Sequence, residues 1–188
     1  MDCLRSAQVN ADCSGEGTQP ARAKPAAMAR LILKTPLEAS AEEVFAWHSR
    51  PGALQRLLPP WQDVRLEESQ GGLEVGARRT LSLGLGPLRV PMRAVHTGYE
   101  PGRCFQDTLE SGPFRSWRHH HRFHPRDESG SVLEDEIEFT YHGGKLLELL
   151  ANPFVVPQLR RMFTFRHRRT RHDLERHAGR ATLRVGLT

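Results

Sequence analysis

Six strand-length segments follow one another between residues 64 and 141, and turns rich in glycine and proline separate them. The segments are Val64–Glu68, Leu73–Gly84, Leu88–Tyr99, Arg103–Glu110, Ser116–His124 and Val132–Tyr141. Short turns between consecutive strands join neighbours in an antiparallel sheet. The sequence therefore predicts an antiparallel meander as the centre of the fold.

Helical signals lie on both sides of this meander. A first strand at Arg30–Thr35 precedes a capping box formed by Ser40 and Glu43, which predicts a short helix, and Pro51 begins a second short helix at Gly52–Leu58. After residue 144, apolar residues recur at helical spacing, at Val155, Leu159, Met162, Phe163, Thr170 and Leu174. Because Pro153 and Pro157 interrupt a helix, we expect the continuous part to begin near residue 155.

This order of elements predicts an α+β chain with the helix-grip fold, in which a curved antiparallel β-sheet wraps around a long C-terminal α-helix and two short helices follow the first strand. Residues 1–28 have no apolar period and read as a disordered N-terminal tail, with Met28 as a candidate initiator. Residues 29–178 form the predicted domain, and residues 179–188 read as a flexible tail.

Composition narrows the class of protein. Of the 188 residues, 38% are hydrophobic and 26% are charged, which excludes a fully disordered chain, a collagen-like repeat and a membrane protein. No run approaches the ~18 to 20 consecutive apolar residues of a membrane-spanning helix, and no apolar block of a secretion signal is present. We therefore expect a cytoplasmic protein without membrane insertion. Three cysteines without metal-like spacing predict neither a disulfide framework nor a zinc site.

The net charge of +5 is concentrated in one segment. Residues 158–177 contain seven arginines and two acidic residues, so this segment alone accounts for the charge of the chain. Its exposed face, with Arg160, Arg161, Arg168, Arg169 and Arg171, is a candidate surface for anions or nucleic acid. Nucleic acid is the weaker of these readings, because the strands show no exposed aromatic platform.

Several motifs resemble bacterial members of the SRPBCC superfamily, the START and polyketide-cyclase-like ligand-binding proteins. The motifs are Pro60–Trp61, Gly71–Gly72–Leu73, Tyr99–Glu100–Pro101–Gly102, Gly112–Pro113–Phe114, Trp117 through Phe123, Arg161–Met162–Phe163 and Phe165–Arg166–His167. The resemblance covers about residues 29–178 and is strongest to a subgroup found alone or fused to an NAD-binding sugar-epimerase-like domain. It implies the helix-grip fold, a small hydrophobic ligand and an epimerase-like protein as a candidate partner, with no settled activity.

Alternation along the strands identifies the residues that face the interior. Trp117 and Phe123 are expected to face inward, and the alternation places His119 and His121 on the same face. In the last strand, Leu133, Ile137 and Phe139 are expected to face inward, and the alternation places Asp135 with them. Phe105 brings Asp107 inward, and Val90 and Met92 do the same for His96. Glu134, Glu136 and Glu138 are expected to face solvent. Centring the hairpin turns pairs His121 with Asp135 and His119 with Asp107.

This polar cluster allows three interpretations. The first is a structural network of buried, mutually satisfied groups. The second is a head-group contact for an apolar ligand held by Val90, Met92, His96, Phe105, Trp117, Phe123, Ile137, Phe139 and Arg166. The third is cyclase- or dehydratase-type catalysis, in which His119 or His121 is a general base oriented by Asp107 or Asp135. An ordinary surface arginine is the alternative for Arg166. We expect no cofactor and no metal, because the sequence spacing places no third ligand beside the two histidines.

Overall fold

The structure is a computed structural model, and it describes residues 28–85 and 87–185. It contains seven strands and three helices in the order predicted by the sequence. The strands are β1 (Ala29–Leu37), β2 (Val64–Gln70), β3 (Arg78–Leu85), β4 (Leu88–Glu100), β5 (Cys104–Ser111), β6 (Ser116–Pro125) and β7 (Ser131–Thr140). The helices are α1 (Ala41–His48), α2 (Ala53–Arg56) and α3 (Gly144–Val185). The predicted tail of residues 1–28 lies outside the described residues apart from Met28.

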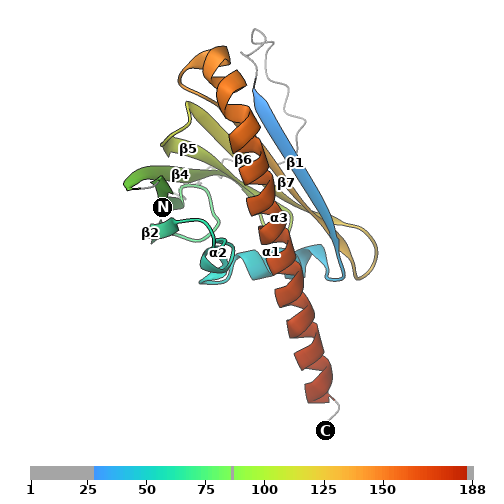
Figure 1. Cartoon of the computed structure of the whole chain (residues 1–188). Coiled ribbons are helices and arrows are strands. Elements are labelled where there is room, and N and C mark those ends of the chain that lie inside the picture. Colours follow the sequence, from blue (N-terminus) through green and yellow to red (C-terminus); the bar gives the residue numbers. More distant parts are fainter. Residues whose placement is uncertain (1–27, 86, 186–188) are drawn as a thin grey trace, which may run out of the picture.

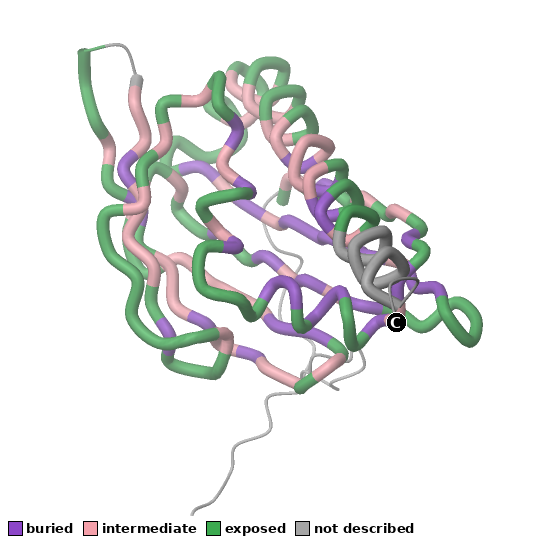
Figure 2. The backbone as a smooth tube through the Cα atoms, turned by 90° about the horizontal axis from the view of Figure 1, so that it is seen from below, coloured by how far each residue is buried: buried purple, intermediate pink, exposed green. Residues whose placement is uncertain are grey.

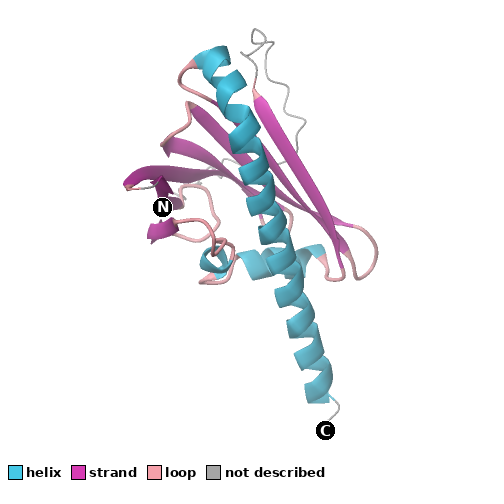
Figure 3. Ribbon diagram, in the orientation of Figure 1, coloured by secondary structure: helices cyan, strands magenta, loops and turns pink. Residues whose placement is uncertain are grey.

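All strands form one antiparallel sheet in the order β1-β7-β6-β5-β4-β3-β2. The meander β2 to β7 follows the chain, and β1 joins the sheet beside β7. The sheet curves, α3 crosses its concave face, and α1 and α2 lie at one end (Figures 1 and 3). This arrangement is the α+β helix-grip architecture that the sequence predicts.

Local sequence signals account for the short helices. Ser40 caps α1: its hydroxyl accepts from the Glu43 backbone N–H at 3.2 Å, and the Glu43 carboxylate accepts from the Ser40 N–H at 2.9 Å. The third strand begins at Arg78 and not at Leu73 as predicted, because a turn with Gly76 at a φ of 91° occupies the preceding residues.

The long helix is longer at both ends than the sequence predicts. Pro153 and Pro157 lie inside α3 and do not delay its start to residue 155. They are four residues apart and exposed, so the backbone hydrogen bonds that they remove lie on one solvent-facing side of the helix. At the other end, the backbone is helical to Val185 where a flexible tail from residue 179 was expected. Arginine, alanine and leucine are good helix formers, which favours this extension.

The core lies between the sheet and α3, with a second part between the sheet and α1. Phe163 of α3 packs with Trp117, Ile137 and Phe139 of the sheet in one cluster. Phe45 of α1 belongs to a second cluster, together with Leu37, Val44, Phe105, Phe123 and Leu133. Figure 2 shows buried stretches along α1 and the strands, while α3 alternates between buried and exposed positions.

Phe163 should contribute strongly to stability. Its side chain is 0% exposed, so Phe163→Ala leaves a cavity in the contact between helix and sheet. We expect a loss of about 3–5 kcal/mol in the free energy of unfolding, measured by urea denaturation. Phe154→Ala on the same helix is the control, because Phe154 is 74% exposed and its truncation should change stability little. Equal losses in the two variants would contradict the packing of α3 described here.

Candidate functional site

The candidate site is a group of polar side chains on the concave face of the sheet. Along β6, Trp117, His119, His121 and Phe123 are buried and alternate with more exposed residues, as the predicted parity requires. The register pairs His121 with Asp135 of β7 and His119 with Asp107 of β5. Both pairings confirm the predicted register. The next strand pairs His96 of β4 with Asp107.

The opposite face of β7 differs from the prediction. Glu134 and Glu136 point away from the cluster, yet both are buried and do not simply face solvent. Arg122 of β6 covers them, with its Nη1 donating to Glu136 at 2.7 Å and to Glu134 at 3.1 Å. Lys34 and Arg30 of β1 add ion pairs to Glu134 and Glu136, respectively. Because β7 lies between β1 and β6, basic side chains from both neighbours exclude water from this face.

In the cluster, two imidazoles lie between two carboxylates. The rings of His119 and His121 are 3.8 Å apart between centroids. Asp107 Oδ2 lies 3.3 Å from His119 Nδ1 and 3.9 Å from His121 Nε2. Asp135 Oδ1 lies 2.7 Å from His121 Nδ1 and 3.4 Å from His119 Nε2. The alignment on the Asp135 side is poor, so these three atoms make no hydrogen bond with the described residues.

The two histidines have opposite charge preferences. Burial alone would lower the pKa of His119, but Asp107 and Asp135 outweigh burial and raise this pKa to about 9. Burial and the neighbouring charge of His119 lower the pKa of His121 to about 3. Burial would raise the pKa of Asp135, but interactions with the surrounding histidines hold it well below its usual range. At neutral pH the cluster therefore holds one imidazolium and two carboxylates.

His167 is a member of this cluster that the sequence reasoning missed. From α3 it donates a hydrogen bond through Nε2 to Asp135 Oδ2 at 3.0 Å, and its Nδ1 accepts from the hydroxyl of Thr35 on β1 at 2.8 Å. The signal was present, because position 167 follows Phe163 by four residues and precedes Thr170 by three on the apolar stripe of the helix. His167 thus connects the helix to β7 and to its neighbour β1.

His48 and Arg166 also lie near the cluster. His48 of α1 is buried, its ring centroid is 6.2 Å from that of His121, and its Nδ1 donates to the Val44 carbonyl at 2.8 Å. Burial lowers the pKa of Arg166, whereas Asp135 and Asp107 act in the opposite direction, so this guanidinium lies near enough to the two carboxylates to interact with their charge. Its Nε is buried without a hydrogen-bond partner among the described residues, and its Cζ lies 4.8 Å from the centroid of the Phe163 ring. Arg166 is therefore not an ordinary surface arginine.

The predicted apolar lining packs against the helices. Trp117, Ile137, Phe139 and Met92 contact the cluster around Phe163, and Phe105 and Phe123 contact the cluster around Phe45. Val90 is half-buried, and His96 donates from Nδ1 to the Leu73 carbonyl at 2.9 Å. The ring of Phe163 lies 4.9 Å from that of His119. At the polar cluster, Phe163 and His167 of α3 pack against the histidines and Asp135 on the face where the ligand was predicted to bind.

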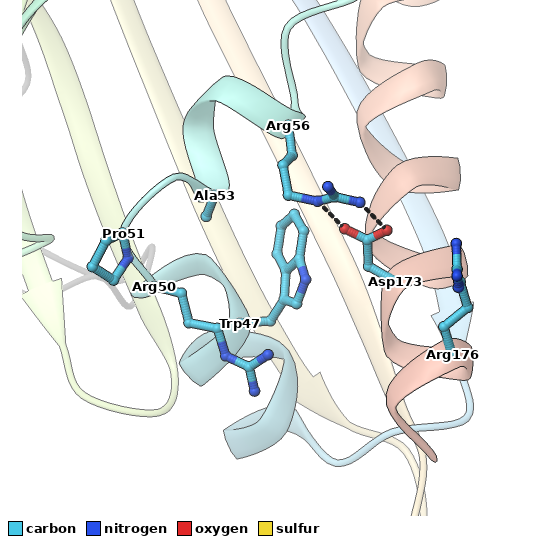
Figure 4. A pocket seen from close by; sticks show the side chains of 7 residues that line it. All are labelled: Trp47, Arg50, Pro51, Ala53, Arg56, Asp173 and Arg176. Carbon is cyan, nitrogen blue, oxygen red and sulfur yellow. Dashed lines mark hydrogen bonds and ion pairs between the residues drawn. The ribbon is translucent and has the colours of Figure 1, made fainter. Parts of the chain in front are cut away.

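Two pockets lie on the flanks of α3, and neither is lined by a residue of the predicted interior site. Three arginines of the predicted anion-binding surface, Arg160, Arg161 and Arg168, line the second pocket. The first has a volume of about 340 Å³ and is lined by Trp47, Arg50, Pro51, Ala53, Arg56, Asp173 and Arg176. In it, Arg56 donates two hydrogen bonds to Asp173, at 2.5 and 2.6 Å, and connects α2 to α3 (Figure 4). This bidentate pair closes one side of the pocket.

The second pocket, here called the Trp61 groove, has a volume of about 570 Å³. It lies between the segment that joins α2 to β2 and the outer flank of α3, and it is lined by Trp61, Pro157, Arg160, Arg161, Thr164, Phe165 and Arg168. Trp61 and Phe165 meet edge to face with centroids 5.0 Å apart. The Arg161 guanidinium lies 4.6 Å from the centroid of the Trp61 ring.

Comparison with known proteins identifies the family. Residues 28–175 match the family described as "Polyketide cyclase / dehydrase and lipid transport". The chain belongs to this family. The polyketide cyclase/dehydrase match covers the whole predicted domain except its last residues, and it agrees with the resemblance to the SRPBCC superfamily. A comparison with curated proteins finds no match to the sequence.

Solved structures show the same fold. A norcoclaurine synthase point mutant from Thalictrum flavum is 14% identical, with a TM-score of 0.65 over 83% of this chain and 99% of that chain. The Zhui aromatase/cyclase from Streptomyces sp. R1128 is 13% identical, with a TM-score of 0.64 over 81% and 96%. A nucleoside-diphosphate sugar epimerase from Corynebacterium glutamicum is 24% identical, with a TM-score of 0.61 over 81% of this chain and 30% of that longer chain. Within the described residues, no helix is both long and apolar enough to cross a membrane.

Asp135 should be required for stability. Asp135→Ala leaves the buried donor of His167 and the imidazolium of His119 without this partner, and we expect a loss of about 3 kcal/mol in the free energy of unfolding. Asp135→Asn keeps an oxygen that accepts from His167 and should lose about 1 kcal/mol. Urea denaturation of both variants tests this, with Glu38→Ala as a control of small effect because the Glu38 side chain is 77% exposed. An unchanged stability in Asp135→Ala would show that the cluster does not depend on this carboxylate.

His48 makes stability depend on pH. Burial lowers its pKa to about 4 from an ordinary value of 6.5, so the unfolded chain binds a proton more readily than the folded protein. The contribution of His48 is therefore present above pH 6.5 and is lost as the pH falls toward 4, by up to about 3 kcal/mol. His48→Phe keeps an aromatic ring among Trp47 and Phe123 and removes the titration.

The measurement is the free energy of unfolding at several pH values between 4 and 7. The slope of this free energy against pH reports how many more protons the unfolded chain binds than the folded protein. This number should be smaller by about one in His48→Phe than in the unsubstituted protein. Identical slopes would mean that His48 titrates normally in the folded state.

Proposed function

We propose that the protein binds a small amphipathic anion, with an aromatic or acyl body, in the Trp61 groove. Membership of the polyketide cyclase/dehydrase and lipid transport family supports a small-molecule ligand. The observation that carries the proposal is the groove itself, whose volume of about 570 Å³ falls in the range usual for small-molecule sites.

The lining of the groove explains the proposed ligand chemistry. Trp61 is 43% exposed, so a flat or flexible apolar body that covers this ring would remove apolar surface from water. Arg160, Arg161 and Arg168 place guanidinium groups around the same floor, and they favour a carboxylate or phosphate at the end of the ligand. The basic helix thereby serves as a local anion site. Nucleic acid is less well supported, since this groove has the volume of one small molecule.

The interior cluster supports ligand binding or catalysis less well. His119 with its raised pKa could donate a proton and His121 could accept one, which is the pair of groups that a cyclase or dehydratase needs. However, His119 is 3% exposed, and Phe163 and His167 of α3 pack against the cluster. A substrate would have to displace these side chains, so we propose a carrier or sensor and keep the enzyme as the alternative.

Two other expectations stay predictions. The similarity to a sugar epimerase rests on 24% identity, which establishes a shared fold and leaves an epimerase-like partner as a hypothesis. The cytoplasmic location is likewise an expectation from the sequence.

A titration with dodecanoate and with 2-naphthoate tests the proposed ligand class. Binding to the unsubstituted protein, Trp61→Ala, Arg161→Ala and Arg103→Ala would be measured by calorimetry. We expect Trp61→Ala and Arg161→Ala each to weaken binding roughly tenfold, because each removes a contact of about 1 to 2 kcal/mol. Arg103→Ala is the matched control, since Arg103 is an exposed arginine that does not line the groove.

Dodecanol provides a second control for charge. Dodecanol should bind to the unsubstituted protein more weakly than dodecanoate does. The affinity for dodecanol should be the same in the unsubstituted protein and in Arg161→Ala. If Trp61→Ala binds both carboxylates as tightly as the unsubstituted protein does, the ligand site lies elsewhere.

A further inference from the structure

We propose that Asp107, His119 and His121 form a binding site for a divalent transition-metal ion such as Zn²⁺. The site is separate from the Trp61 groove and shares no residue with it. This inference replaces the expectation that the chain has no metal site, which followed from the lack of a third ligand in the sequence spacing.

The sheet register supplies that third ligand. Residues 119 and 121 lie on the same face of β6, and Asp107 lies opposite His119 on β5. One potential ligand atom from each of the three residues lies within 4.8 Å of the corresponding atoms of the other two. The carboxylate oxygen of Asp107 lies 3.3 Å from His119 Nδ1 and 3.9 Å from His121 Nε2. These distances between ligand atoms are close to those around a single ion with bonds of about 2.0 to 2.2 Å.

The second ring nitrogen of each histidine provides independent support. His119 Nε2 and His121 Nδ1 both face Asp135 Oδ1, at 3.4 and 2.7 Å. A carboxylate at the distal nitrogen is the usual arrangement around metal-binding histidines, because it orients the ring and strengthens the ligand. Asp135 is itself held by His167 at 3.0 Å. The two histidines thus have the candidate ligand Asp107 on one side, and the Asp135 carboxylate lies near their other ring nitrogens.

Charge and solvent access agree with this assignment. Asp107 and Asp135 bring two negative charges into the interior, which the His119 imidazolium balances only in part. A divalent ion would displace the proton of His119 and neutralise both carboxylates. Arg166 lies near these carboxylates but makes no ion pair within 4.0 Å among the described residues. The Asp107 side chain is 15% exposed, more than the two histidines, so the site reaches solvent at β5.

Two histidines and one carboxylate favour Zn²⁺ or Fe²⁺ over Mg²⁺ or Ca²⁺, which prefer oxygen ligands. Three protein ligands also leave a coordination position for water or another small ligand.

The test is equilibrium dialysis of the full chain against Zn²⁺ after treatment with a chelator, followed by elemental analysis. We expect about one equivalent of zinc in the unsubstituted protein. Asp107→Asn and His121→Gln should each weaken zinc binding at least 100-fold. His120→Gln is the matched control, because His120 lies between the two histidines in the sequence but on the other face of β6, and its substitution should leave zinc binding unchanged.

Co²⁺ provides a second readout through its visible ligand-field absorption, which should appear in the unsubstituted protein and in His120→Gln and be absent from Asp107→Asn. Asp107→Asn is nearly isosteric, so circular dichroism should show it folded even if His121→Gln fails to fold. Trp61→Ala should keep its zinc, which separates this proposal from the ligand groove. Substoichiometric zinc in the unsubstituted protein, or equal zinc affinity in folded Asp107→Asn, would overturn the proposal.

Discussion

The contact between Asp135 and His167 is the interaction on which the interior of this protein depends. A buried carboxylate must have partners, and Asp135 lies in β7, between β1 and β6, where water cannot supply them. It therefore has His121 and His119 beside it in the sheet and His167 above it on α3. His167 also contacts Thr35 of β1, so one side chain determines where the helix lies relative to two strands. Phe163, one turn earlier, then packs against His119 and the aromatic floor of the sheet.

The contact between Asp135 and His167 affects where a small molecule could bind in this fold. The solved structures of a norcoclaurine synthase and an aromatase/cyclase share the helix-grip architecture with this chain at 13–14% identity. In this chain Phe163 and His167 of α3 pack against the polar cluster, and other residues of α3 line the Trp61 groove. A concave sheet and a long helix therefore leave room for two separate candidate sites. One is an apolar groove with arginines at its edge, and the other is a compact cluster of histidines and aspartates beneath the helix.

The sequence predicted much of this arrangement because it depends on local rules. Turn residues and alternation identified six strands, the capping box of Ser40 identified α1, and the parity of β6 placed His119 and His121 inward. Centring the hairpin turns gave an approximate register, and the structure confirms the pairing of His121 with Asp135 and of His119 with Asp107. Each of these features is decided by residues that are close together in the chain, so the sequence alone contains the information.

Only the tertiary structure decided the remaining features, since they depend on contacts between distant segments. His167 reaches Asp135 across 32 positions of sequence, and Trp61 meets Phe165 only after α3 has docked on the sheet. Glu134 and Glu136 alternate as exposed residues should, yet β1 and β6 supply the cations that bury them. The prolines at 153 and 157 read as breaks, although a helix tolerates them on its solvent side. Alternation assigns a residue to a face, but only packing of the remote helix shows whether that face borders a cavity, another side chain or water.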